Sequence, residues 1–179
     1  MRLPRFITLA AVTGAAASLL FAAPALAVGP AASPAAHAAV VRAELRAEIS
    51  AQLRYNPSGK VINARQISYD HGSVIVTVPM PGSVGPDFTC PGQTLCAFTG
   101  VNLTGLVAQF AGNGVWDNWK SMINTLASLH NNRSNRAFIY QNKGSGGNTC
   151  YQGGAKAEEI GSPFNGYTWF YLAKSNDTC

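Results

Sequence analysis

The chain has 179 residues, 47% of them hydrophobic and 12% charged, and its net charge at pH 7 is +5. This length suits one medium-sized domain, or a small domain that carries an extension. Because the basic residues are scattered rather than clustered, the sequence lacks the basic patch of a nucleic-acid-binding protein, and no nucleic-acid partner is expected.

Residues 1–27 are predicted to be a secretory signal peptide. Arg2 and Arg5 give it a basic start, an uncharged and largely apolar stretch follows, and residues 25–27 (ALA) form a small-x-small cleavage site. Residues 36–38 (AHA) are an alternative cleavage site. The apolar stretch is short, and no other run is long and apolar enough to cross a bilayer, so no transmembrane segment is predicted. The sequence thus predicts a secreted, extracellular protein.

The segment after the signal peptide is predicted to contain a linker and a helix. Residues 28–39 (VGPAASPAAHAA) are rich in alanine and proline and are expected to be a disordered linker. An amphipathic helix is then predicted to end before Asn56 and Pro57. Its apolar residues recur near helical spacing and are Val40, Val41, Leu45, Ile49 and Leu53. This stripe has no aromatic residue, which favours a helix that docks on the protein over one that lies on a membrane.

A β-hairpin is predicted to complete this extension, which spans residues 40–82. Residues 60–69 alternate partly between apolar and polar types, residues 70–72 (DHG) are a turn, and residues 73–78 (SVIVTV) have the pattern of a strand. The hairpin is predicted to end at residues 79–82, which are the turn residues PMPG. Because a two-stranded hairpin is marginal on its own, it is expected to pack on the helix or to join the main domain.

Residues 84–179 are predicted to form an all-β sandwich, because frequent turns separate short apolar stretches. Strands are expected at residues 95–98, 106–110, 128–130, 137–140 and 168–172, and turns at residues 112–114, 131–132 and 144–147. Residues 116–128 fit a helical turn as well as an extended crossover. The aromatic run at residues 167–171 favours a central strand over a ligand platform.

One short pattern occurs twice in this domain. Six residues separate Phe98 from Gly105 and Tyr140 from Gly147, and the two aromatic residues lie 42 positions apart. Such a period indicates two copies of one supersecondary unit, although a chain rich in glycine and aromatic residues can also show it by chance. In each copy the aromatic ring is expected to lie across a tight hairpin whose glycine adopts a positive φ.

Four cysteines, Cys90, Cys96, Cys150 and Cys179, lie in the last part of the chain. An even number behind a signal peptide indicates two disulfides, for which three pairings exist. The close spacing favours Cys90–Cys96, which leaves Cys150 to pair with Cys179. A zinc site is the alternative, but the C-x5-C spacing without a nearby histidine does not suit it.

The sequence lacks the residue patterns of common enzyme classes. His37, His71 and His130 are far apart, and there is no H-E-x-x-H, G-x-S-x-G or phosphate-binding loop motif. Glu158 and Glu159 are adjacent, so on a strand they would point to opposite faces rather than act as an acid–base pair. The protein is therefore predicted not to be an enzyme.

Three stretches of the main domain together resemble a known family. They are residues 90–105 (CPGQTLCAFTGVNLTG), 127–132 (ASLHNN) and 138–147 (FIYQNKGSGG). These residues resemble the βγ-crystallin-like secreted proteins of actinobacteria, in particular the streptomycete metalloproteinase inhibitor family. The resemblance covers about residues 90–179 and implies two Greek-key units packed as a sandwich, two disulfides and inhibition of thermolysin-like zinc endopeptidases. It does not explain the helix and hairpin upstream.

The resemblance also raises the question of calcium. Calcium-binding members carry two Asn or Asp residues, two free positions, a Ser or Thr and a final Ser, which supply hard oxygen ligands. Asp117, Asn118 and Ser121 match the pattern, but Met122 stands at the place of the final serine. Calcium is therefore not expected as a cofactor, and no other cofactor is implied. Ser128 is expected instead to form a hydrogen bond that closes its own Greek-key hairpin.

A peptidase inhibitor needs a rigid, exposed loop on a stable scaffold. Residues 91–95 qualify if the adjacent cysteines are paired. A second candidate inhibitory loop is residues 112–120, where Trp116, Asp117 and Trp119 offer aromatic anchors and a carboxylate that could approach a zinc ion. The alternative is that at least one of these tryptophans belongs to the core of the first Greek-key unit.

The sequence and the resemblance together predict a secreted, monomeric inhibitor whose partner is an extracellular metallopeptidase. Two alternatives stay open. One is an antimicrobial or toxin-like protein of the same fold that acts on envelopes or glycans, and the other is an envelope-associated protein that responds to calcium.

Overall fold

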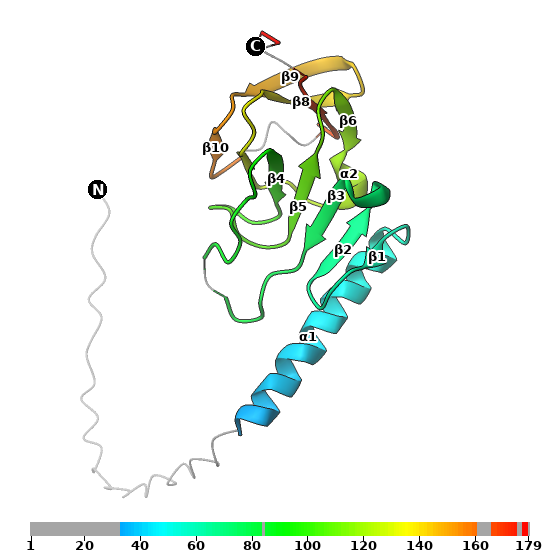
Figure 1. Cartoon of the computed structure of the whole chain (residues 1–179), viewed down its shortest axis with the longest axis vertical. Coiled ribbons are helices and arrows are strands. Elements are labelled where there is room, and N and C mark those ends of the chain that lie inside the picture. The colour runs from blue at the N-terminus through cyan, green and yellow to red at the C-terminus, as the bar shows by residue number, and fades with distance from the viewer. Residues whose placement is uncertain (1–32, 84, 161–165, 175–176, 179) are drawn as a thin grey trace, which may run out of the picture. The chain divides into compact units, whose positions relative to one another are not determined.

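The structure is a computed structural model, shown in Figure 1, and it describes residues 33–83, 85–160, 166–174 and 177–178. These residues belong to one compact unit, Ser33–Cys179. The predicted signal peptide lies outside the described residues. Within the described ranges, no helix is both long and apolar enough to span a membrane.

Helix α1 spans Pro34–Tyr55 and therefore begins six residues before the predicted start. Ser33 caps it, because its side chain accepts a hydrogen bond from the backbone N–H of Ala36, and proline suits the first helical position. The prediction of a linker is thus wrong for residues 34–39. The C-terminal end is as predicted, with Asn56 as the capping residue.

The predicted hairpin is confirmed, and it belongs to the larger of two sheets. Its strands are β2 (Gln66–Tyr69) and β3 (Val74–Thr77), which pair antiparallel across the 3-10 turn η1 (Asp70–Gly72). A short edge strand, β1 (Lys60–Val61), pairs with β2. Strand β3 also pairs with a strand of the main domain, so the extension widens that domain's sheet.

The main domain contains eight strands among the described residues. They are β4 (Thr94–Phe98), β5 (Val107–Ala111), β6 (Val115–Asn118), β7 (Ser128–Asn131), β8 (Ala137–Asn142), β9 (Ser145–Tyr151), β10 (Lys156–Ala157) and β11 (Trp169–Leu172). The five predicted strands correspond to β4, β5, β7, β8 and β11. A single helical turn, α2 (Trp119–Met122), follows β6, so the ambiguous stretch is partly extended and partly helical. Strand β9 begins inside the turn predicted at residues 144–147, because Ser145 already pairs with Asn142 of β8.

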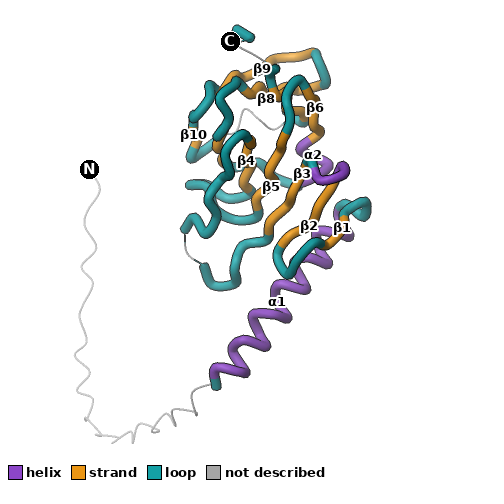
Figure 2. The backbone as a smooth tube through the Cα atoms, in the orientation of Figure 1, coloured by secondary structure: helices purple, strands orange, loops and turns teal. Residues whose placement is uncertain are grey.

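The eight strands form two interlocked four-strand units, β4–β7 and β8–β11. Sheet A has the order β1-β2-β3-β5-β4-β7-β10, and sheet B has the order β6-β11-β8-β9 (Figures 1 and 2). Each unit therefore contributes its third strand to the other unit's sheet: β6 pairs with β11, and β10 pairs with β7. This is a pair of Greek keys packed as a sandwich. The predicted fold, with a helix and a hairpin in front of it, is confirmed.

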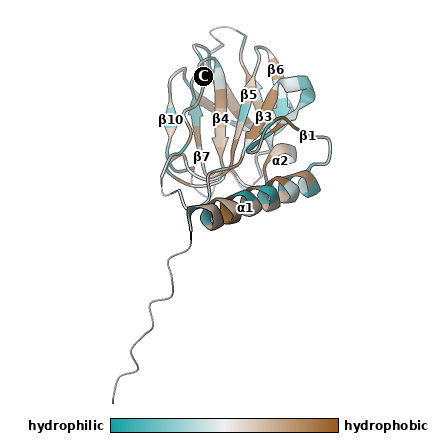
Figure 3. Ribbon diagram, turned by 60° about the horizontal axis from the view of Figure 1, so that its bottom comes forward, coloured by the Kyte–Doolittle hydropathy of each residue, from teal (hydrophilic) through white to brown (hydrophobic). Residues whose placement is uncertain are grey.

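The two sheets and α1 share one hydrophobic core. Phe110 of sheet A and Phe170 of sheet B meet edge to face, with ring centroids 5.1 Å apart. Because sheet A is wider than sheet B, sheet B does not shield the inner face of β2 and β3 from solvent, and another element must do so. Leu45 and Ile49 of α1 provide this cover by packing in the same cluster as Ile67. Figure 3 shows α1 lying across the ends of the strands.

Ser128 closes the hairpin between β4 and β5, as the sequence predicts. Its Oγ accepts a hydrogen bond from the N–H of Leu103 at 3.0 Å and donates one to the carbonyl of Gly100 at 2.6 Å. Gly105 has a φ of 78°, which confirms the predicted positive φ in the first unit.

The corresponding prediction is wrong for Gly147. In the hairpin between β8 and β9 the positive φ values occur at Gly144 and Gly146, because a tight turn joins the two strands directly. A side chain at position 147 would instead collide with the hydroxyl of Tyr167, which lies 2.9 Å from the place of a Cβ atom. This glycine is needed for a close approach rather than for its φ.

Candidate functional site

An exposed turn closed by a disulfide stands at the start of β4. The disulfide joins Cys90 and Cys96, the pair favoured by the sequence, and their Cα atoms lie 5.9 Å apart. Both cysteines are buried, whereas residues 91–93 between them are exposed. The hydroxyl of Thr94 donates a hydrogen bond to the carbonyl of Pro91 at 2.7 Å. The turn therefore presents its tip to solvent while both of its ends are anchored.

Asn132, which follows β7, fixes the turn from the neighbouring strand. Its backbone N–H donates to the carbonyl of Thr94 at 3.0 Å, and its own carbonyl accepts from the N–H of Gln93 at 2.8 Å. Its side-chain amide donates to the carbonyl of Cys90 at 2.7 Å. One residue thus holds both ends and the tip of the turn. Gln93 has a φ of 62°, a left-handed conformation that these bonds help to maintain.

The turn rests on a small apolar cluster on the outer face of sheet A. The buried members are Cys90, Cys96, Phe98 and Val107, with Phe88 and Leu103 packed against them. The rings of Phe88 and Phe98 lie edge to face with centroids 6.4 Å apart. Beside this cluster, Arg65 and Asp87 form an ion pair at 2.7 Å, which ties the segment before the turn to the hairpin. The chain that leads into the turn is therefore anchored as well.

The second candidate loop, residues 112–120, is a turn only at residues 112–114. Trp116 and Asp117 lie in strand β6, and Trp119 begins α2. Trp119 is 4% exposed and stacks on Phe170 in the core, as the alternative interpretation of these tryptophans expects. Trp116 lies on the outer face of sheet B and stacks on Tyr171 with centroids 4.8 Å apart. Both tryptophan rings therefore pack on other rings of the same domain. The disulfide-held turn, whose residues 91–93 are exposed, is the better candidate for contact with a partner.

Asp117 lies in an environment that disfavours its charge. Burial, the first cause, and the nearby carboxylate of Asp70 raise its pKa from 3.8 to about 6, while Arg133 acts in the opposite direction. Its Oδ2 is buried without a hydrogen-bond partner among the described residues. Arg133 is itself buried and donates to the carbonyls of Gly112 at 2.9 Å and Ala173 at 3.0 Å, so it does not form an ion pair with Asp117.

The three residues that match the calcium pattern lie in β6 and α2. Asp117 and Asn118 are adjacent in a strand, so their side chains point to opposite faces of sheet B. The hydroxyl of Ser121 donates to the carbonyl of Asn118 at 2.7 Å. Within the described part of the chain, no three His, Cys, Asp or Glu side chains are grouped as metal ligands would be.

The structure describes one of the two cysteines in the second predicted disulfide. Cys150, at the end of β9, is disulfide-bonded. Its predicted partner, Cys179, lies outside the described residues, so the pairing of these two cysteines stays a prediction.

Comparison with known proteins places this site in a recognisable segment. Residues 85–152 match the model of peptidase inhibitor family I36, and the match includes the turn and Asn132. A solved structure described as "Evolution of the eye lens beta-gamma-crystallin domain fold" is similar to the chain, with 16% identity and a TM-score of 0.41, over 57% of this chain and 98% of that one. No curated protein matches the chain.

Proposed function

Because residues 85–152 match the model of peptidase inhibitor family I36, we propose that this protein inhibits a peptidase by inserting the turn at residues 91–93 into its cleft. The observation that supports this proposal is that the residues of the turn are exposed to solvent while its backbone is held in place. Its three exposed residues are held by the disulfide Cys90–Cys96 and by three hydrogen bonds of Asn132. The family is one of inhibitors, in agreement with the prediction that the protein is not an enzyme.

Restraint of the turn supports inhibition for an energetic reason. A flexible loop loses freedom when it binds, at a cost of about 0.5–1.5 kcal/mol for each side chain that becomes immobile. In this turn the disulfide and Asn132 already restrain the backbone, so less freedom is left to lose on binding. The hydroxyl of Thr94 also bonds the carbonyl of Pro91, which keeps the backbone turned rather than extended. Peptidases cleave extended substrates, so this turn would block a cleft without being cut.

The class of target follows from the resemblance to the streptomycete metalloproteinase inhibitors. That resemblance supports a thermolysin-like zinc peptidase as the partner of a monomeric inhibitor. The predicted signal peptide supports secretion, and a disulfide such as Cys90–Cys96 persists in the oxidising environment outside the cell.

Titration into peptidase assays tests this function. Residues 28–179, oxidised, would be added in increasing amounts to a thermolysin-type zinc peptidase and, separately, to a trypsin-like serine peptidase. We expect activity of the zinc enzyme to fall to zero at about one equivalent, with residues 91–93 uncut in the recovered inhibitor and the serine enzyme unaffected. Full activity of the zinc enzyme at a large excess, or cleavage within the turn, would contradict the proposal.

A further inference from the structure

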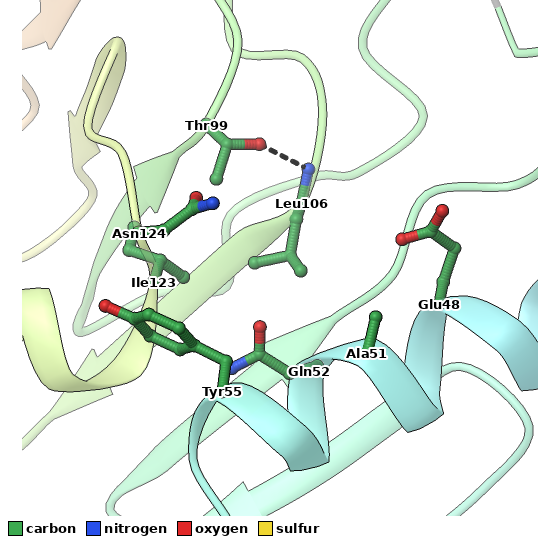
Figure 4. Close-up of a pocket in the computed structure, with 8 residues that line it drawn as sticks. All are labelled: Glu48, Ala51, Gln52, Tyr55, Thr99, Leu106, Ile123 and Asn124. Carbon is green, nitrogen blue, oxygen red and sulfur yellow. Dashed lines mark hydrogen bonds between the residues drawn. The ribbon is translucent and has the colours of Figure 1, made fainter.

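A pocket unrelated to the disulfide-held turn lies where α1 meets the main domain. Its volume is about 240 Å³. Figure 4 shows the residues that line it, which are Glu48, Ala51, Gln52, Tyr55, Thr99, Leu106, Ile123 and Asn124. Half of these belong to α1, which precedes the segment that matches the inhibitor family. The pocket is therefore a feature of the whole chain rather than of that segment alone.

Gln52 gives the pocket a hydrogen-bond acceptor. This side chain is 7% exposed, and its amide nitrogen donates a hydrogen bond to the carbonyl of Met122 at 2.6 Å. Because a carbonyl can only accept, this bond fixes which end of the amide faces Met122. The amide oxygen is directed into the pocket, as Figure 4 shows, and none of the described residues donates a hydrogen bond to it. This oxygen is not fully enclosed, so it is available to accept a hydrogen bond from a group that enters the pocket.

Further oxygen atoms and a negative charge line the same pocket. Thr99 accepts a hydrogen bond from the N–H of Leu106 at 3.0 Å, which holds its hydroxyl at the pocket wall. Asn124 adds an exposed amide, and Glu48 adds an exposed carboxylate at the rim. Among the described residues, the one ion pair joins Arg65 and Asp87, so the charge of Glu48 is not neutralised within that part of the chain.

The other walls of the pocket are apolar or aromatic. Ala51, Leu106 and Ile123 supply aliphatic surface. The hydroxyl of Tyr55 donates to the carbonyl of Lys120, which holds the ring at the edge of the pocket. The pocket thus combines an aliphatic wall, a ring, several oxygen acceptors and one negative charge.

We propose that this pocket receives an arginine side chain of a partner protein. A guanidinium offers five N–H donors in a plane, which suits a group of oxygen acceptors, and it stacks on aromatic rings such as that of Tyr55. The methylene groups of the side chain would lie against Leu106 and Ile123. Its charge complements that of Glu48. A lysine ammonium has three donors and no flat face, so it satisfies fewer of these groups.

Nuclear magnetic resonance with short peptides tests this assignment. The probe is a blocked tripeptide with arginine between two glycines, added to ¹⁵N-labelled residues 28–179. The matched control carries citrulline, which has the shape of arginine without its charge, and a third peptide carries lysine. We expect the arginine peptide to shift the side-chain amide signals of Gln52 and Asn124 in a saturable way. The citrulline and lysine peptides should bind at least about fivefold more weakly.

Variants of the protein complete the test. Glu48→Gln should weaken binding of the arginine peptide about five- to tenfold, because a charge-assisted hydrogen bond becomes a neutral one. Glu159→Gln removes an exposed charge that does not line the pocket and should change nothing. Both positions are exposed, and equal melting temperatures would show that both variants fold. The assignment is overturned if no signal of Gln52 or Asn124 moves, if citrulline or lysine binds as tightly as arginine, or if Glu48→Gln has no effect.

Discussion

Asp117 illustrates how the sandwich changes the chemistry of a single residue. It belongs to β6 and lies opposite Phe170 in the pairing with β11, so its carboxyl faces the same side of sheet B as a fully buried ring. Burial and the nearby Asp70 together raise its pKa to about 6. An acid whose pKa is higher in the folded state keeps its proton there longer than in the unfolded chain. Folding stability therefore falls as pH rises from about 4 to about 6 and stays lower above that range.

Replacing Asp117 by asparagine should remove this loss of stability. We expect Asp117→Asn to increase the free energy of unfolding at pH 7 by about 1–2 kcal/mol, a range reduced because the carboxyl is partly exposed to screening water. At pH 4, where the aspartic acid is largely protonated in the folded state, the two proteins should be about equally stable. Urea unfolding at both pH values measures the difference, with Glu159→Gln as the control for loss of an exposed charge. A variant that is less stable than the parent at pH 7 would show that attraction to Arg133 outweighs burial.

Some residue roles can be predicted from the sequence and others cannot. The Cys90–Cys96 pair and the hydrogen bonds of Ser128 follow from short spacing and from the family pattern. Asn132 and Gln52 were missed because their partners are distant in sequence: Asn132 bonds residues about forty positions earlier, and Gln52 bonds Met122. An asparagine at the end of a strand is a signal for local hydrogen bonding. It does not reveal which distant carbonyl the amide will meet.

At the level of elements, α1 serves as cover for a sheet that the hairpin has widened. Sheet B has four strands and cannot shield the inner face of β1, β2 and β3 in the seven-stranded sheet A. Ile49 packs in the core cluster at 8% exposure, and Gln52 bonds both Tyr69 and Met122. The helix and the hairpin therefore depend on each other and on the main domain.

Truncating the buried face of α1 should destabilise the whole unit. We expect Ile49→Ala to lower the free energy of unfolding by about 2–4 kcal/mol, because it removes buried methyl groups and leaves a cavity. Val40→Ala is the matched control on the same helix; Val40 is 55% exposed, and its change should stay within about 0.5 kcal/mol. Chemical denaturation followed by tryptophan fluorescence would measure both. Equal effects at the two positions would mean that α1 does not pack on the core.

The strands that the sequence fails to predict share one physical property. Strands β6 and β9 are the edges of sheet B, and β10 is an edge of sheet A. Their residues are exposed or half-buried, so they lack the short apolar stretches that mark β4, β5, β7, β8 and β11. Two of them, β6 and β10, pair with strands of the other unit, an interaction set by the closed sandwich rather than by local sequence.

At the scale of the whole molecule, two interlocked units, a widened sheet and a helix form one scaffold around the exposed turn. The exchange of β6 and β10 means that neither unit can open without breaking a sheet of the other. We propose that this scaffold forms without calcium, because Met122 stands where the calcium-binding pattern has its final serine.

Thermal unfolding tests the independence from calcium. A ligand that binds the folded state raises its melting temperature, so adding millimolar calcium after removal of metals should leave Tm within about 1 °C. Magnesium at the same concentration controls for ionic strength. A rise of several degrees with calcium alone would reveal a site and would return the calcium-responsive alternative to consideration.

The central claim is that the turn at residues 91–93 contacts a peptidase, and one pair of variants tests it most directly. Gln93 and Asn102 are both exposed, and both have a positive φ, at 62° and 55°. Glycine adopts a positive φ without steric strain, so Gln93→Gly and Asn102→Gly should both fold. Each variant deletes one exposed side chain.

The measurement is the inhibition constant of each variant against a thermolysin-type zinc peptidase. We expect Gln93→Gly to weaken inhibition about tenfold or more, as a central interface residue would, while Asn102→Gly inhibits like the parent protein. If Gln93→Gly inhibits as tightly as the parent, or if Asn102→Gly is the variant that fails, the turn held by Cys90–Cys96 is not the inhibitory surface.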